Sequence, residues 1–115
     1  MKQVLIHGKN GLLVNATLCD TFLSESRGYM FRRPSGTFLF KLPWRTRLFG
    51  AIHTFFVSFP LQVVWLDKEM TVTDTVTARP WGIHWPKHSA AYIMETPADQ
   101  PLPVMVGDRL RLEPC

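Results

Sequence analysis

The feature that most limits how this chain can fold is the uncharged run Leu48–Leu66, LFGAIHTFFVSFPLQVVWL. It contains half of the eight Phe, in a chain in which 19% of the residues are charged. Its length approaches the roughly 20 apolar residues that a membrane span needs. However, the run also contains a proline and polar side chains, and each polar group costs free energy in lipid unless it is paired. These residues are His53, Thr54, Ser58, Pro60 and Gln62. The sequence therefore predicts no membrane span.

Two buried strands explain this run better than a buried helix does. Phe, Val, Ile and Thr dominate it, and these residues prefer strands. Pro60 would also break a helix, because it lacks a backbone donor and its ring clashes with the preceding turn. We therefore predict a strand over Ala51–Phe59, a bend at Pro60 and a second strand over Leu61–Leu66. The near-continuous apolar character indicates strands that are covered on both faces of a sheet.

The rest of the chain predicts an all-β fold. A length of 115 residues suits a single domain over 1–115, and nine Pro and seven Gly indicate short elements separated by turns. Asn10-Gly11 is a strong signal for a hairpin turn. Further strands are predicted over Val4–Ile6, Leu12–Cys19, Thr37–Leu42, Thr71–Thr77, Ala90–Glu95 and Arg109–Leu112. About eight short strands indicate a compact β-sandwich or barrel.

One short helix and two loops complete the predicted order. Asp20 and Thr21 can cap a helix over Phe22–Arg27, so the helix lies near 21–27. The segment Pro43–Gly50 is predicted as a loop. So is Arg79–Ser89, RPWGIHWPKHS, which is rich in Pro and Trp.

No cysteine or histidine pattern predicts a metal or a disulfide. Cys19 lies in a predicted strand and Cys115 is the last residue, a pair that gives little support for a bridge. His84 and His88 have the spacing of metal ligands on a helix, but Trp and Pro surround them, so we expect loop histidines. Only three apolar residues lie between Lys2 and His7, which is too few for a secretory leader. We therefore expect a cytoplasmic protein.

Three blocks of the sequence resemble a known family. Asp20-Thr21 followed by Arg27–Arg32 (RGYMFR), Ile52–Asp67 (IHTFFVSFPLQVVWLD) and Ala91–Glu95 (AYIME) before Gly107-Asp108 are similar to the motifs of the domain of unknown function 192. The resemblance runs in order from about Leu12 to Leu112. It implies a compact, mostly β fold of sandwich or jelly-roll-like kind with a short helix after the first strands. It implies no reaction, and some family members are exported.

This chain departs from the family motifs at three places. Gln62 stands where the family usually has Asp, and Tyr29 stands where it usually has Leu. The turn after the family's Leu-Asp contains Gly, whereas here it is Asp67-Lys68-Glu69. If the family's Asp has a role that depends on its charge, this chain has lost that role.

Catalytic motifs are missing from the sequence. Cys19 has no basic neighbour that would lower its pKa, and Ser58 lies outside the G-x-S-x-G turn of hydrolases. His53 could act as a general base, although no partner for it is visible, and a hydrogen-bonded core or rim histidine is the simpler interpretation. We expect no cofactor and a protein that is not an enzyme. A hydrolase-like enzyme remains an alternative, which a metal or a carboxylate beside His53 would favour.

Positive charge is concentrated in the segment 27–47. The net charge of the chain is +4, and no acidic residue lies between Glu25 and Asp67. Aromatic residues alternate with the basic ones there, as in surfaces that bind phosphates or single-stranded nucleic acid. A solvated basic surface or a contact for a protein partner would produce the same pattern.

The sequence favours a non-enzymatic β domain that binds a small molecule or a protein partner. Trp81 and Trp85 could stack on a ligand from the rim of the fold, or they could fill one end of a barrel. The family-like blocks around Arg27 and His53 both approach chain turns, where binding residues tend to gather. The predicted binding surface is Arg27, Arg32, His53, Trp81, His84 and Trp85, with anion or nucleic-acid binding through 27–47 as an alternative.

Overall fold

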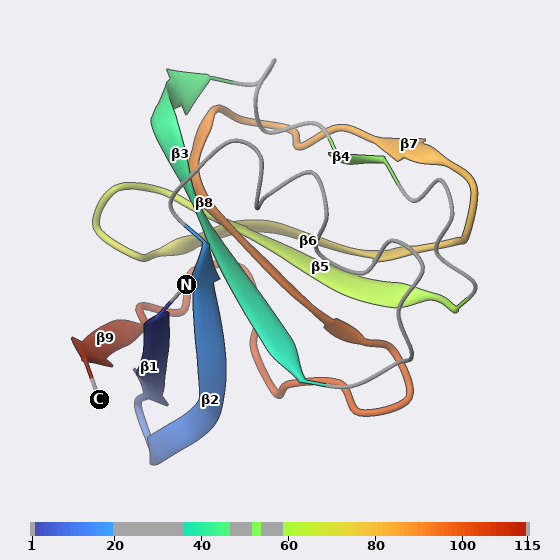
Figure 1. Cartoon of the computed structure of the whole chain (residues 1–115). Helices are drawn as coiled ribbons and strands as arrows, with labels where there is room; N and C mark the ends of the chain where they lie inside the picture. Colours follow the sequence, from blue (N-terminus) through green and yellow to red (C-terminus); the bar gives the residue numbers. More distant parts are fainter. Residues whose placement is uncertain (1, 20–35, 47–51, 54–58, 115) are drawn as a thin grey trace.

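The computed structural model of the chain describes residues 2–19, 36–46, 52–53 and 59–114 (Figure 1). Within these residues the regular structure consists of strands and turns, without a helix. The predicted all-β class is confirmed. The predicted helix near 21–27 falls outside the described residues.

Seven strands form one sheet, and two further strands form a second, separate sheet. The order across the large sheet is β6-β5-β8-β3-β2-β1-β9, and the small sheet is β4-β7. The strands are β1 Lys2–Gly8, β2 Gly11–Cys19, β3 Thr37–Thr46, β4 Ile52–His53, β5 Leu61–Leu66, β6 Val72–Ala78, β7 Ile83–His84, β8 Ala90–Pro97 and β9 Arg111–Pro114. All paired strands are antiparallel except β2 and β3, which are parallel.

The uncharged run folds as predicted where the structure describes it. β5 has the predicted bounds, and Pro60 precedes it outside any strand. The predicted strand Ala51–Phe59 is wrong at its end, because Phe59 lies in a bend and only β4 is described as strand. No helix long and apolar enough to cross a membrane occurs in the described part of the chain.

Two predicted loops contain strand. β3 continues to Thr46, so the loop predicted from Pro43 begins too early. The pairing of β3 with β8 is irregular between Lys41 and Thr46, and such irregularities are where a sheet tolerates proline. The loop predicted over Arg79–Ser89 contains β7, which is too short to give a periodic signal.

The central strands are buried on both faces. Side chains that alternate along β3, β5 and β8 belong to two different apolar clusters, one on each face. The Trp65 cluster consists of Phe38, Phe40, Leu61, Val63, Trp65, Ala78, Ala90 and Ile93. The Leu66 cluster consists of Val4, Ile6, Ala16, Leu39, Val64, Leu66, Met70, Val72, Met94, Val104 and Leu110. This arrangement explains why β5 is apolar at almost every position.

The sheet curls around the Leu66 cluster and nearly closes on itself. β1 and β5 lie far apart in the strand order, yet Ile6 and Leu66 belong to the same cluster. The edge strand β6 is also linked to the segment before β9, at the opposite edge. The Val72 amide donates to the Asp108 carbonyl at 2.8 Å, and the Gly107 amide donates to the Val72 carbonyl at 2.8 Å. The curvature is therefore barrel-like on this side of the sheet.

The turn between β5 and β6 contains a strained residue. Asp67 Oδ1 accepts hydrogen bonds from the amides of Glu69 and Thr71, each at 2.9 Å. Met70 has a φ of 64°, a left-handed conformation that costs a bulky residue free energy. Its side chain is buried in the Leu66 cluster, so apolar burial offsets the strain.

Candidate functional site

A short exposed segment before β8 carries three large apolar side chains. Trp81, Ile83 and Trp85 are 60%, 56% and 55% exposed. We call residues 81–85 the aromatic ribbon. β7 lies within it, and Figure 1 shows it at the edge of the molecule, away from β1 and β9. The Trp side chains are on the surface, so the alternative in which they fill one end of a barrel is wrong.

A tight turn presents the first of these side chains. Pro80 and Trp81 form the turn, and Trp81 has a φ of 61°. Glycine or asparagine usually occupies a turn position with positive φ. A tryptophan there is a strained conformation, and such conformations gather at functional sites.

His84 stabilises the same turn from within β7. Its Nε2 lies 3.4 Å from the carbonyl oxygen of Arg79, to which it can donate. A Cβ atom at Gly82 would lie 2.9 Å from this nitrogen, so the imidazole occupies the space that a side chain at position 82 would need. His84 therefore shapes the aromatic ribbon.

The structure brings the backbone of His53 next to this ribbon. In the β4-β7 pair, His53 is in register with Ile83, and Ile52 is in register with His84. Two segments of the predicted binding surface thus meet, although about thirty positions separate them in the chain. Arg27 and Arg32 lie outside the described residues, so their part of the surface stays a prediction.

A buried carboxyl group is a candidate residue that the sequence did not indicate. Glu95 in β8 is in register with Phe38 on one side and with Val63 on the other. Residues in register point to the same face, so its side chain lies among the Trp65 cluster. It is 8% exposed, and burial raises its pKa from the ordinary 4.5 to about 8.

A carboxyl that titrates near neutral pH can give or take a proton. Its position at the end of a predicted apolar strand gave no hint of this property. The family-like block Ala91–Glu95 (AYIME) contained the residue, but a strand ending in Glu usually ends in solvent.

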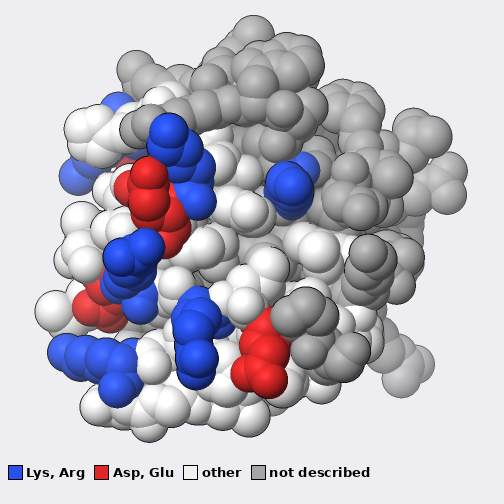
Figure 2. Space-filling view, turned by 90° about the vertical axis from the view of Figure 1, so that its left-hand side faces the viewer, with Lys and Arg blue, Asp and Glu red and all other residues white. Residues whose placement is uncertain are grey.

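The described side chains hold neither a metal-binding group nor an excess of charge. Among them, no three His, Cys, Asp or Glu gather closely enough to hold a metal ion. Seven side chains of Lys and Arg and seven of Asp and Glu are described, and the side chains of Lys2 and Arg45 lie outside this set. On the face shown in Figure 2 the two signs are interleaved. The net charge of +4 therefore arises from side chains outside the described set.

Comparison with known families decides the relationship that the motifs indicated. The model of the DUF192 family, described as "Uncharacterized ACR", matches residues 4–112. The chain belongs to the DUF192 family. A UPF0127 protein of Pyrococcus abyssi is 40% identical over 95 residues, which are 81% of each chain. One of Thermococcus kodakarensis is 37% identical over 111 residues, which are 94% of this chain and 67% of the relative.

Two solved structures share the fold of this DUF192 chain. One, from Sinorhizobium meliloti 1021, is described as a "putative transcription regulator" and has a TM-score of 0.81 at 21% identity. The match covers 96% of this chain and 92% of that one. The other, a protein of unknown function from Novosphingobium aromaticivorans, has a TM-score of 0.73 at 16% identity, with 95% and 83% covered. At these identities the likeness concerns the fold.

Proposed function

We propose that this protein is a non-enzymatic binding module and that a protein partner docks on the aromatic ribbon. One observation carries the proposal: three large apolar side chains, each more than half exposed, lie within five consecutive residues. Exposed apolar groups that lie together mark interaction surfaces. Tryptophan is also the residue most enriched among those that dominate binding energy.

The exposure of the ribbon favours a protein partner over a small ligand. Small molecules bind in concave sites that bury most of their surface, whereas these side chains extend into solvent. A partner that covers them gains about 25 cal/mol for each Å² of apolar area removed from water. The indole N–H of Trp85 can meanwhile donate a hydrogen bond at the rim of the contact.

The strained turn supports the same conclusion. The chain keeps a bulky residue at this turn position, although a φ of 61° suits glycine. The imidazole of His84 contacts the Arg79 carbonyl in the same turn. A turn that is already formed positions the backbone of Trp81 before binding, and preorganisation lowers the entropy cost of association.

Nucleic acid is the weaker candidate. The description of the Sinorhizobium protein would suggest it, but at 21% identity that likeness supports a shared fold alone. If a basic surface of this protein bound nucleic acid, the affinity would fall steeply as the salt concentration rises.

Site-directed photo-crosslinking tests the proposal. A photoreactive phenylalanine analogue replaces Ile83 in the ribbon or, as a matched control, Met105, which is 69% exposed elsewhere on the molecule. In an extract of the source cells, position 83 should give an adduct of one defined mass that position 105 does not give. Identical adducts from both positions, or none from position 83, would contradict the proposal.

A further inference from the structure

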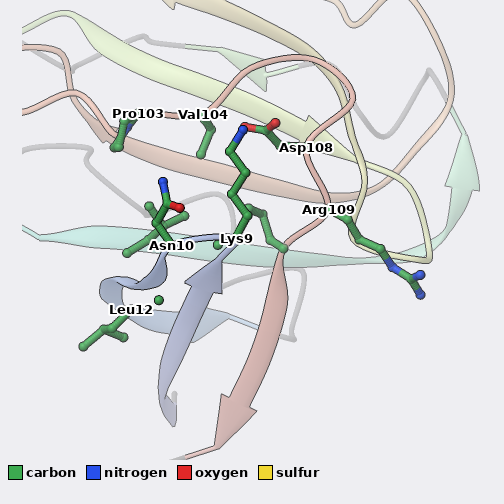
Figure 3. Close-up of a pocket in the computed structure, with 11 residues that line it drawn as sticks. Lys9, Asn10, Leu12, Pro103, Val104, Asp108 and Arg109 are labelled. Atoms are coloured by element: carbon green, nitrogen blue, oxygen red, sulfur yellow. The ribbon is translucent and has the colours of Figure 1, made fainter.

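A cavity of about 280 Å³ lies apart from the aromatic ribbon. It opens between the turn of the β1-β2 hairpin, Gly8–Leu13, and the segment 103–110 (Figure 3). None of the residues of the aromatic ribbon lines it. Its volume is just below the roughly 300–1,000 Å³ of sites for drug-sized ligands, so it suits a smaller molecule.

The segment 103–110 forms one wall of this cavity, and hydrogen bonds hold it at both ends. At one end the side chain of Gln62 pairs with the backbone of Leu102: Nε2 donates to the carbonyl at 3.0 Å and Oε1 accepts from the amide at 2.7 Å. At the other end, the Leu110 amide donates to the Met70 carbonyl at 2.9 Å. Between them, Asp108 Oδ2 accepts from the Met105 amide at 2.9 Å. The wall is therefore formed before any ligand arrives.

The floor of the cavity is apolar. Val104 and Leu110 are 9% and 4% exposed and belong to the Leu66 cluster, against which Leu13 also packs. A Cβ atom at Gly8 would lie 3.1 Å from Leu13, so the glycine lets the Leu13 side chain lie close to the backbone. An aliphatic chain on this floor would lose contact with water on several sides.

Polar groups lie at one end of the cavity. In Figure 3 the side chain of Lys9 extends towards Asp108, and the amide of Asn10 points into the same space. Arg109 points away from both, and its Nε donates to the Glu69 carbonyl at 3.4 Å. Lys9 is therefore the cation that a bound molecule would meet.

From this geometry we infer that the cavity binds a compact amphipathic carboxylic acid. Its carboxylate contacts the ammonium of Lys9 and the amide N–H of Asn10, both of which are donors. Its aliphatic body lies on Leu13, Val104 and Leu110. Asp108 opposes the anion in part, while Lys9 and the positive net charge of the whole chain favour it.

Titration of the isotope-labelled full chain with sodium hexanoate, followed by NMR, tests this inference. Saturable shifts should appear at the amides of Leu13, Val104 and Leu110. From butanoate to hexanoate each added methylene should tighten binding about fourfold, the factor equivalent to ~0.8 kcal/mol per buried CH₂. No saturation, or equal binding of hexylammonium, overturns the inference.

Three substitutions near the polar end sharpen the test. Lys9→Gln should weaken hexanoate binding threefold or more, whereas Arg109→Gln, which removes the cation that points away, should change it less than twofold. Asp108→Asn keeps an acceptor for the Met105 amide and removes the opposing charge, so it should tighten binding. A Lys9→Gln effect below threefold, or weaker binding in Asp108→Asn, overturns the inference.

Discussion

At the scale of single residues, Glu95 makes the stability of the protein depend on pH. Its pKa is raised to about 8 by burial, so the folded chain holds this proton at pH values where the unfolded chain has lost it. The contribution of Glu95 to stability is therefore largest below its ordinary pKa of 4.5, and it is lost as the pH rises towards 8. The total change is of the order of a few kcal/mol.

Replacing Glu95 by glutamine should remove this dependence. Glu95→Gln keeps the size of the side chain but cannot ionise, so urea unfolding from pH 5 to pH 9 should give a flatter profile and greater stability than the wild type at pH 9. Glu69→Gln, at an exposed side chain, provides the control. A wild-type profile that rises with pH between 5 and 8 would refute this role of Glu95.

Trp81 is the second residue whose local conformation has a measurable consequence. Because its φ of 61° suits glycine, Trp81→Gly should stabilise the fold by about 1 kcal/mol, since the side chain is largely exposed. Trp85 is not among the residues with positive φ, so Trp85→Gly should destabilise by roughly 0.5–1 kcal/mol. Thermal unfolding of both variants measures these two changes in stability. A loss of stability in Trp81→Gly as large as in Trp85→Gly would mean that the turn is unstrained.

At the scale of elements, the pairing between Gln62 and Leu102 connects β5 to the segment after β8. The amide of glutamine can donate and accept at once, whereas an ionised carboxylate can only accept. Gln62 therefore has a structural role in a position where family members usually carry Asp. An Asp there could accept from the Leu102 amide but could not donate to its carbonyl while ionised.

Gln62→Glu tests this role, since it preserves the length of the side chain. We expect a loss of about 1–3 kcal/mol at pH 7, because the carboxylate faces the Leu102 carbonyl. The loss should shrink at low pH, where the protonated acid can donate. Gln3→Glu is the matched control: Gln3 donates to Thr17 Oγ1 at 2.9 Å on an exposed surface, and its effect should stay below about 0.5 kcal/mol. Equal losses in chemical denaturation would exclude the proposed role of Gln62.

The elements that the sequence could predict are those with a strong local pattern. β5 follows from an apolar run bounded by Pro60 and Asp67, and the β1-β2 hairpin follows from Asn10-Gly11, where Gly11 has a φ of 108°. β7 was missed because two residues cannot show a period. Its pairing with β4 depends on a contact between distant segments, which no local pattern encodes.

The candidate site was predictable only where large apolar side chains occur in a segment that should be exposed to solvent. Tryptophans in a loop rich in proline indicated the exposed ribbon, because a loop runs over the surface. Ile83 was missed, since a single apolar residue in a loop is ordinary. Glu95 was missed because its pKa depends on two neighbouring strands that pack beside it.

At the scale of the whole molecule, the two proposed sites lie on different parts of the fold. The sheet curls around the Leu66 cluster, and the cavity opens where the β1-β2 hairpin meets the segment that links the two edges of the sheet. The aromatic ribbon follows β6 and leads into β8. A ligand in the cavity and a partner on the ribbon could therefore bind at the same time.

The central claim is that the aromatic ribbon supplies the binding energy for a partner. Its most direct test is calorimetric titration of the partner identified by crosslinking at position 83 against two variants of the full chain. Trp85→Ala should weaken binding at least tenfold, about 1.4 kcal/mol, while Met105→Ala, at a control position that is also more than half exposed, should change it less than twofold. Equal affinities of the wild type and Trp85→Ala would contradict the account.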